Sequence, residues 1–307
     1  MRALACGALA STLLAAGSAR GCPCSDDSGS FSGLVQQDER YAAALVATSR
    51  QALGRFDALS HYSALGPKER ETSEELLLRA GFRGPARFEG VGELGYSSYR
   101  FHAPRLAEQQ SGLGDALLRA RYRAFDEAMP HERFPMPAIS FTALLRAPLG
   151  AIAKDRVGSF GSGGAQRGLG AWEVGAGFEL MRAVAPRLQI SLSGEGAYRF
   201  EDHVLGSSRK LGPRFDATLG SRALATDWLA ASVALRLRMT GDVALAGRSL
   251  DGTSERLVSL IVGASAAHER SRFRSALTVI LDPPVAGLSR GSTAAISLGV
   301  SLGIGIR

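Results

Sequence analysis

The feature that most constrains this chain is a strict alternation of residue type that persists over long stretches. Residues 188–200 are the clearest example. Every second position from Leu188 to Phe200 is apolar or glycine, and the positions between them carry Gln, Ser, Glu, Ala and Arg. Residues 294–307 repeat the pattern, with Ala, Ile, Leu and Val on one face and mostly Ser and Gly on the other. A period of two residues is typical of a β-strand whose two faces meet different surroundings.

The same alternation, strong in some segments and weaker in others, predicts twelve strands. Each is long enough, at about nine to eleven residues, to cross an outer membrane while tilted. The expected strands are 40–53, 74–83, 88–96, 116–125, 139–146, 172–180, 188–200, 215–223, 229–240, 255–268, 272–282 and 294–307.

The links between these strands alternate in length. Short links are expected at 84–86, 183–186, 225–227 and 268–271, and long links at 54–73, 102–113, 149–168, 201–212, 241–254 and 283–291. The link 126–136 is longer than the rhythm requires. This pattern predicts an up-and-down barrel with loops at one end and tight turns at the other. An even number of strands places both termini at the tight-turn end.

The sequence therefore predicts an all-β fold, a twelve-stranded antiparallel up-and-down transmembrane β-barrel of the outer-membrane type. Strands survive in lipid only if the sheet closes, because lipid cannot satisfy backbone hydrogen bonds. Aromatic residues near strand ends fit the girdles of such barrels; these are Trp172, Phe200, Phe215 and Trp228. A soluble β-sandwich also alternates, but its strands usually run shorter and lack this rhythm of links.

The first residues resemble a secretory signal. Arg2 supplies a positive charge, residues 3–16 are small and apolar, and residues 17–19 are Gly-Ser-Ala. We therefore expect a signal peptide over 1–19, a flexible periplasmic tail over 20–39 and the barrel over 40–307. A lipoprotein signal ending at Cys22 is the competing interpretation.

Beyond the signal the chain keeps two cysteines, Cys22 and Cys24, in the tail. Two thiols this close can form a strained local disulfide, bond to a redox or metal-carrying partner, bind a soft metal ion, or have no role. No histidine lies near them to complete a zinc site.

A family resemblance is visible in the first half of the predicted barrel. Residues 112–115 (Gly-Leu-Gly-Asp), followed by the strand 116–125, resemble a turn and strand of the outer-membrane proteins grouped under the meta-pathway of phenol degradation. The strand ending Pro148-Leu149-Gly150 resembles the next strand of that group, which ends Pro-Thr-Gly. The likeness covers about residues 75–307 and implies a transporter or channel for small, often aromatic, molecules.

The sequence predicts neither an enzyme nor a cofactor or metal site. Residues 299–303 match the Gly-x-Ser-x-Gly pattern of hydrolases, but that pattern requires a strand-to-helix turn, and Ser301 falls in the middle of an alternating strand. The five histidines all lie in predicted loops or turns. The glycine-rich residues 161–164 lack the Lys-Ser/Thr of a phosphate-binding loop.

The formal net charge of +7 comes from arginines that are neither clustered on a helix nor interleaved with stacking aromatics, so nucleic-acid binding is not expected. Instead the arginines fall on predicted inward faces, with carboxylates on other inward positions. The predicted lumen and selectivity residues are Arg119, Arg121, Arg123, Arg146, Arg199, Arg222, Arg236, Arg238, Arg272, Arg274, Glu173, Glu179 and Glu195. A water-filled lumen of this kind would favour anions. Cross-paired charges that fill a narrow lumen are the alternative.

We therefore expect an outer-membrane channel of a Gram-negative (diderm) bacterium that passes small solutes, with a preference for organic or aromatic anions. Its expected partners are the lipid bilayer and lipopolysaccharide, the outer-membrane insertion machinery and a small-molecule solute. The chain ends Gly305-Ile306-Arg307, without the terminal aromatic that this machinery commonly recognises. The alternative function is a barrel that transports nothing and docks a periplasmic redox or metal protein through Cys22 and Cys24.

Overall fold

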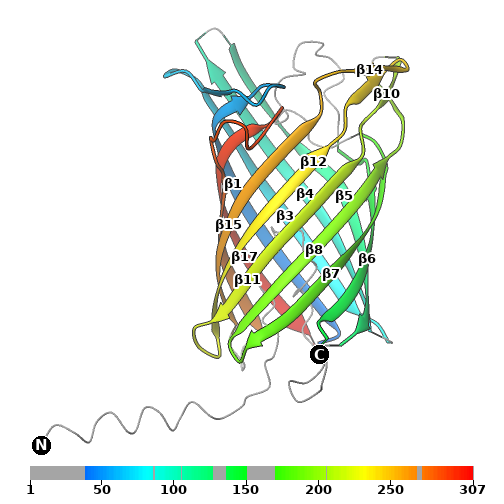
Figure 1. Cartoon of the computed structure of the whole chain (residues 1–307), viewed down its shortest axis with the longest axis vertical. Coiled ribbons are helices and arrows are strands. Elements are labelled where there is room, and N and C mark those ends of the chain that lie inside the picture. Colours follow the sequence, from blue (N-terminus) through cyan, green and yellow to red (C-terminus); the bar gives the residue numbers. More distant parts are fainter. Residues whose placement is uncertain are drawn as a thin grey trace, which may run out of the picture.

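Twelve long strands follow one another around the molecule, each antiparallel to the next (Figure 1). The computed structural model describes residues 39–85, 87–104, 106–126, 136–150, 170–204, 206–267 and 272–306. The long strands are β1 (Tyr41–Phe56), β3 (Arg70–Arg83), β4 (Phe88–Ala103), β5 (Leu106–Phe125), β6 (Ala138–Ala147), β7 (Glu173–Ala185), β8 (Leu188–Arg199), β11 (Arg214–Leu224), β12 (Leu229–Thr240), β15 (Glu255–Ala267), β16 (Phe273–Asp282) and β17 (Thr293–Ile306).

The sheet closes on itself, because the last strand pairs with the first. The β17–β1 pairing runs from Ile306 opposite Tyr41 to Thr293 opposite Arg55 and is interrupted by one irregularity between Ala52 and Gly54. A closed sheet has no unpaired edge, so the long strands satisfy one another's backbone groups. The predicted twelve-stranded antiparallel barrel is confirmed.

The outer surface of the barrel is apolar, as the alternation predicted. Leu118, Leu219, Leu235 and Leu302 are all more than half exposed on this surface. The aromatics Trp172, Phe200, Phe215 and Trp228 are exposed too and lie at or next to strand ends. No helix in the described part of the chain is long and apolar enough to cross a membrane.

The inner face of the barrel carries charged and small side chains. On β8 the inward positions run from Gln189 to Arg199, and on β17 they are mainly Ser and Gly. A small apolar cluster also faces inward, where Leu117, Leu144 and Ala197 are all buried. Apolar side chains therefore fill the part of the interior that lies next to these residues of β5, β6 and β8.

The two ends of the barrel differ. At one end short turns join the strands, for example residues 186–187 between β7 and β8, and β17 finishes there (Figure 1). We call this the turn end. The opposite, loop end carries short strands: β2 (Tyr62–Ala64) pairs with β1, and β9 (Asp202–Val204), β10 (Ser207–Lys210), β13 (Val243–Leu245) and β14 (Arg248–Leu250) form a separate four-stranded sheet.

One predicted long link is wrong. Residues 102–113 were expected to form a loop, but β4 continues to Ala103 and β5 begins at Leu106, so the hairpin turns over two residues. Cross-strand hydrogen bonds sustain this extension, although residues 107–111 show no apolar alternation. The predicted signal peptide, nearly all of the tail, most of the link 126–136 and nearly all of the link 149–168 lie outside the described residues, so those predictions stand as made.

Candidate functional site: the charged interior

The interior charges are organised around Glu173, the first residue of β7. Strand register places it directly opposite Arg146 on β6 and Arg199 on β8. Arg199 donates through Nε to Glu173 at 2.9 Å, Arg214 donates through Nη2 at 3.0 Å, and the Nε of Arg146 lies 3.6 Å away. Glu173 has no exposed surface. One carboxylate thus holds three guanidinium groups from three different strands.

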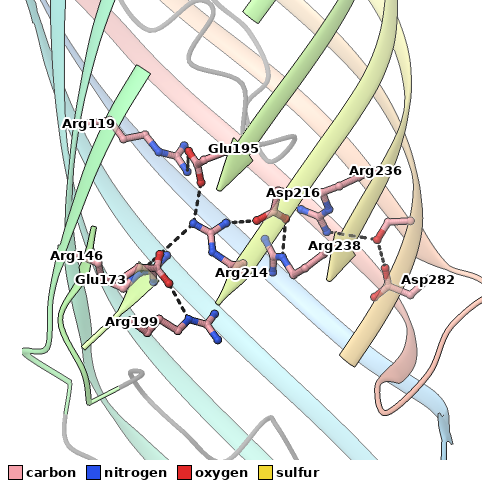
Figure 2. A network of polar contacts seen from close by, with 11 residues as sticks. Arg119, Arg146, Glu173, Glu195, Arg199, Arg214, Asp216, Arg236, Arg238 and Asp282 are labelled. Atoms are coloured by element: carbon pink, nitrogen blue, oxygen red, sulfur yellow. Dashed lines mark hydrogen bonds and ion pairs between the residues drawn. The ribbon is translucent and has the colours of Figure 1, made fainter. Parts of the chain in front are cut away.

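Arg214, at the start of β11, connects this centre to its neighbours (Figure 2). It also donates to Glu195 at 2.7 Å and contacts Asp216 on its own strand. Asp216 in turn accepts a hydrogen bond of 2.7 Å from the Nε of Arg238 on β12, and Glu195 lies 3.7 Å from the Nη2 of Arg119 on β5. The network therefore spans the inner wall from β5 to β12.

Ser259 extends the polar contacts from β12 to β15, β16 and β1. The hydroxyl of Ser259 on β15 donates to Asp282 on β16 at 2.6 Å and accepts from the Nη2 of Arg236 at 3.4 Å. Asp282 also lies 3.6 Å from the Nη2 of Arg50 on β1. We call the whole set the charge belt; its members are Arg50, Arg119, Arg146, Glu173, Glu195, Arg199, Arg214, Asp216, Arg236, Arg238, Ser259 and Asp282.

A second group of charges lies closer to the turn end, and we call it the turn-end cluster. Glu89 on β4 is its centre, with Arg83 at 2.5 Å, Arg121 at 3.4 Å and Arg123 at 4.0 Å. Arg121 reaches past β6 to Glu179 on β7, at 3.2 Å. Both Arg121 and Glu179 are buried. The ion pairs of this cluster join β3, β4, β5 and β7, and the side chain of Arg121 has almost no contact with water.

The remaining predicted residues are placed differently. Arg274 is buried and contacts Glu39, just before β1, so it ties the beginning of the barrel to its last hairpin. Arg222 faces inward on β11, between Gln189 and Ser232. Arg272 was expected on the inner face but is exposed, because it precedes the first residue of β16 and lies at the rim of the turn end. Cys22 and Cys24 lie outside the described residues.

Sequence reasoning missed Arg214, the residue with the most carboxylate partners in the charge belt. The strand around it was predicted to start at Phe215, one residue too late. Arg214 continues the inward alternation of Asp216 and Thr218, so extending the pattern by one step would have found it. Arg50 was also missed, because its segment showed only weak alternation.

Two groupings that resemble catalytic sites have structural explanations. Ser301 lies inside β17, paired with Val46 across the barrel seam, as its alternation predicted. In the loop after β1, the backbone N–H of His61 donates to Asp57 and, together with that of Leu59, holds the pKa of this carboxyl below its ordinary value. The His61 ring lies 3.1 Å from the same carboxylate, but both side chains are exposed, which is typical of a loop turn.

Comparison with known proteins gives a match in structure but not in sequence. No protein-family model matches the chain, and no curated protein matches it. The resemblance to the phenol meta-pathway group therefore remains a prediction.

Among solved structures, the barrel is similar to the COG4313 outer membrane channel from Pseudomonas putida F1, with a TM-score of 0.71 and 15% identity over 90% of this chain and 98% of that one. The KdgM porin in complex with disordered oligogalacturonate gives a TM-score of 0.45 and 8% identity, over 86% of this chain and 99% of that chain. The β domain of the Bordetella autotransporter BrkA gives a TM-score of 0.47 and 16% identity, over 88% of this chain and 100% of that chain. At 15% identity the first similarity concerns the fold alone, and the other two support no closer relationship.

Proposed function

We propose that this protein is an outer-membrane channel of a diderm bacterium that passes small solutes and prefers organic anions. The observation that carries the proposal is the charge belt, which brings guanidinium groups from six of the twelve long strands to the inner face of a closed barrel. A wall of this kind offers a polar path through an apolar surrounding.

The outer surface supports the membrane location. A soluble barrel would expose polar residues outward, whereas here leucines and aromatics cover the outside. The exposed aromatics at both ends match the levels at which Trp and Tyr meet the lipid interface. Lipid, lipopolysaccharide and the outer-membrane insertion machinery are therefore the proposed surroundings of the barrel and its route into the membrane.

The proposed anion preference follows from which charges water can reach. Of the arginines we expected to set selectivity, Arg119, Arg121, Arg123, Arg236 and Arg238, the side chain of Arg238 is 40% exposed, whereas that of Arg121 is only 3% exposed. Arg238 can contact a solute directly. Arg121 is buried beside Glu89 and Glu179, so it can act on a solute only through the electrostatic potential of this group of charges. The side chains of Arg50, Arg146 and Arg238 are 29–40% exposed, whereas no carboxylate of the charge belt is more than 14% exposed, so the accessible part of the wall presents mainly guanidinium groups.

Transport into proteoliposomes tests the proposal. Two small ions with permanent charge, methanesulfonate and tetramethylammonium, avoid leakage of a neutral form across the lipid. We expect protein-containing vesicles to take up methanesulfonate faster than tetramethylammonium, and vesicles without protein to take up neither. Equal uptake, or faster uptake of the cation, would contradict the proposed preference.

The same assay separates the channel from the docking alternative. A chain lacking residues 20–33 loses both Cys22 and Cys24 but keeps every described strand. If the barrel acts alone, methanesulfonate uptake should survive this deletion. Wild-type vesicles that take up neither ion would favour a barrel that serves only to dock a partner.

A further inference from the structure

Arg222 differs from most of the described inward arginines of the barrel. Its Nε and Nη2 atoms are buried and make no hydrogen bond, and no carboxylate lies within ion-pair distance of it among the described residues. By contrast, Arg199, Arg214, Arg238 and Arg121 each contact at least one carboxylate. Arg222 is therefore a cation on the inner wall whose charge no carboxylate of the described residues compensates.

Strand register explains why no carboxylate reaches it. The pairing of β11 with both neighbours is regular, so Arg222 shares the inner face with Asp216, six residues away, or about 20 Å along the strand. Its direct neighbours across the sheet are Gln189 and Ser232, and Gly220 precedes it on the same face. All three are neutral, and two of them are small.

The two unsatisfied atoms lie on the same edge of the guanidinium group. Nε–H and Nη2–H point in parallel, and this edge is one that binds the two oxygens of a carboxylate in a bidentate pair. Buried donors without a partner are costly. Because the Arg222 side chain as a whole is only half-buried, a rotation that turns this edge toward the lumen would let a bound oxyanion satisfy both donors. The arrangement fits a solute that carries a carboxylate better than a spherical anion.

We propose that Arg222 is the binding site for the carboxylate group of a permeating organic anion, near the turn end of the lumen. The inference rests on the proposed channel function and adds to it a chemical class and a residue. In this account the charge belt nearer the loop end attracts anions in general, and Arg222 holds those that carry a carboxylate.

Single-channel recording with benzoate as the probe tests the site. Benzamide has the same ring without the charge and serves as the matched neutral compound. We expect benzoate, but not benzamide, to reduce chloride current through the wild-type channel. Arg222→Gln should weaken this block roughly tenfold, because two charge-assisted hydrogen bonds are lost. Arg222→Lys should also weaken the block by benzoate but keep the preference for chloride. Lysine retains the positive charge but lacks the two parallel N–H donors of the guanidinium group.

Matched variants separate this site from a general effect of charge. Arg248→Gln removes the same charge from an exposed strand outside the barrel and should leave the block unchanged. Arg238→Gln should weaken the block less than Arg222→Gln does. A block by benzoate that survives Arg222→Gln, or that falls equally in Arg238→Gln, would overturn the proposal.

Failure to fold is detected separately, as loss of the mobility shift on boiling in SDS. If Arg222→Gln does not fold, Arg222→Lys carries the test, and an unchanged block in that variant would count against the site. A wild-type protein that conducts no ions, or prefers cations, would instead refute the channel function itself, before any probe is added.

Discussion

Replacing Glu173 with glutamine is expected to lower the free energy of unfolding by about 3–5 kcal/mol, the range for breaking a buried ion pair by removing one partner. The substitution keeps the shape of the side chain but removes its charge. Arg146, Arg199 and Arg214 would then face a neutral amide. The NH2 group of this amide is a hydrogen-bond donor, as are the guanidinium groups around it, so it cannot pair with them. Unfolding by urea in lipid vesicles, followed by the mobility of the folded form in SDS, measures the change.

Glu74→Gln is the matched control for this experiment. Glu74 also faces an arginine, Arg100, but at 4.0 Å, and both side chains are more than half exposed. We expect Glu74→Gln to change the free energy of unfolding by no more than about 0.5 kcal/mol, as for most surface substitutions. A loss of similar size in both variants would mean that Glu173 does not act as the centre of the charge belt.

Replacing Leu235 with arginine is expected to destabilise the protein by about 2–4 kcal/mol, the cost of a cation at the middle of the bilayer on the lipid face of a barrel. Leu235 lies near the middle of β12, between Leu219 and Leu260 on the neighbouring strands, and its side chain is 54% exposed. In water such a substitution on an exposed position would cost little. The same vesicle unfolding assay measures the change.

Leu250→Arg provides the control for this position. Leu250 is also an exposed leucine on a strand, but β14 belongs to the small sheet at the loop end and not to the barrel wall. Its substitution should have almost no effect. Equal effects at the two positions would show that lipid does not cover the outer face around Leu235.

Most of the barrel could be predicted from alternation alone, because lipid and lumen impose opposite demands on successive residues. Strand β8 was expected at 188–200 and is found at Leu188–Arg199. The extension of β4 and β5 through residues 102–113 was missed because residues 107–111 are mostly polar and do not alternate. Where both faces of a hairpin meet polar surroundings, the residues between Leu106 and Gly112 have no reason to alternate.

The site was only partly predictable. Alternation assigns Arg121 and Glu179 to the inner face, but it cannot pair them, since one lies on β5 and the other on β7 and strand register decides their distance. For the same reason, sequence alone treated Arg222 like its neighbours. Only the register of β11 shows that its surroundings are neutral.

The measurement that tests the central claim most directly is the zero-current potential of the purified full-length protein in a planar lipid bilayer under a potassium chloride gradient. We expect discrete conductance steps and a potential whose sign shows that chloride is more permeant than potassium. This would establish that the arginines of the interior, although largely paired, give the lumen a net preference for anions. Absence of conductance, or a potential of the opposite sign, would contradict the account.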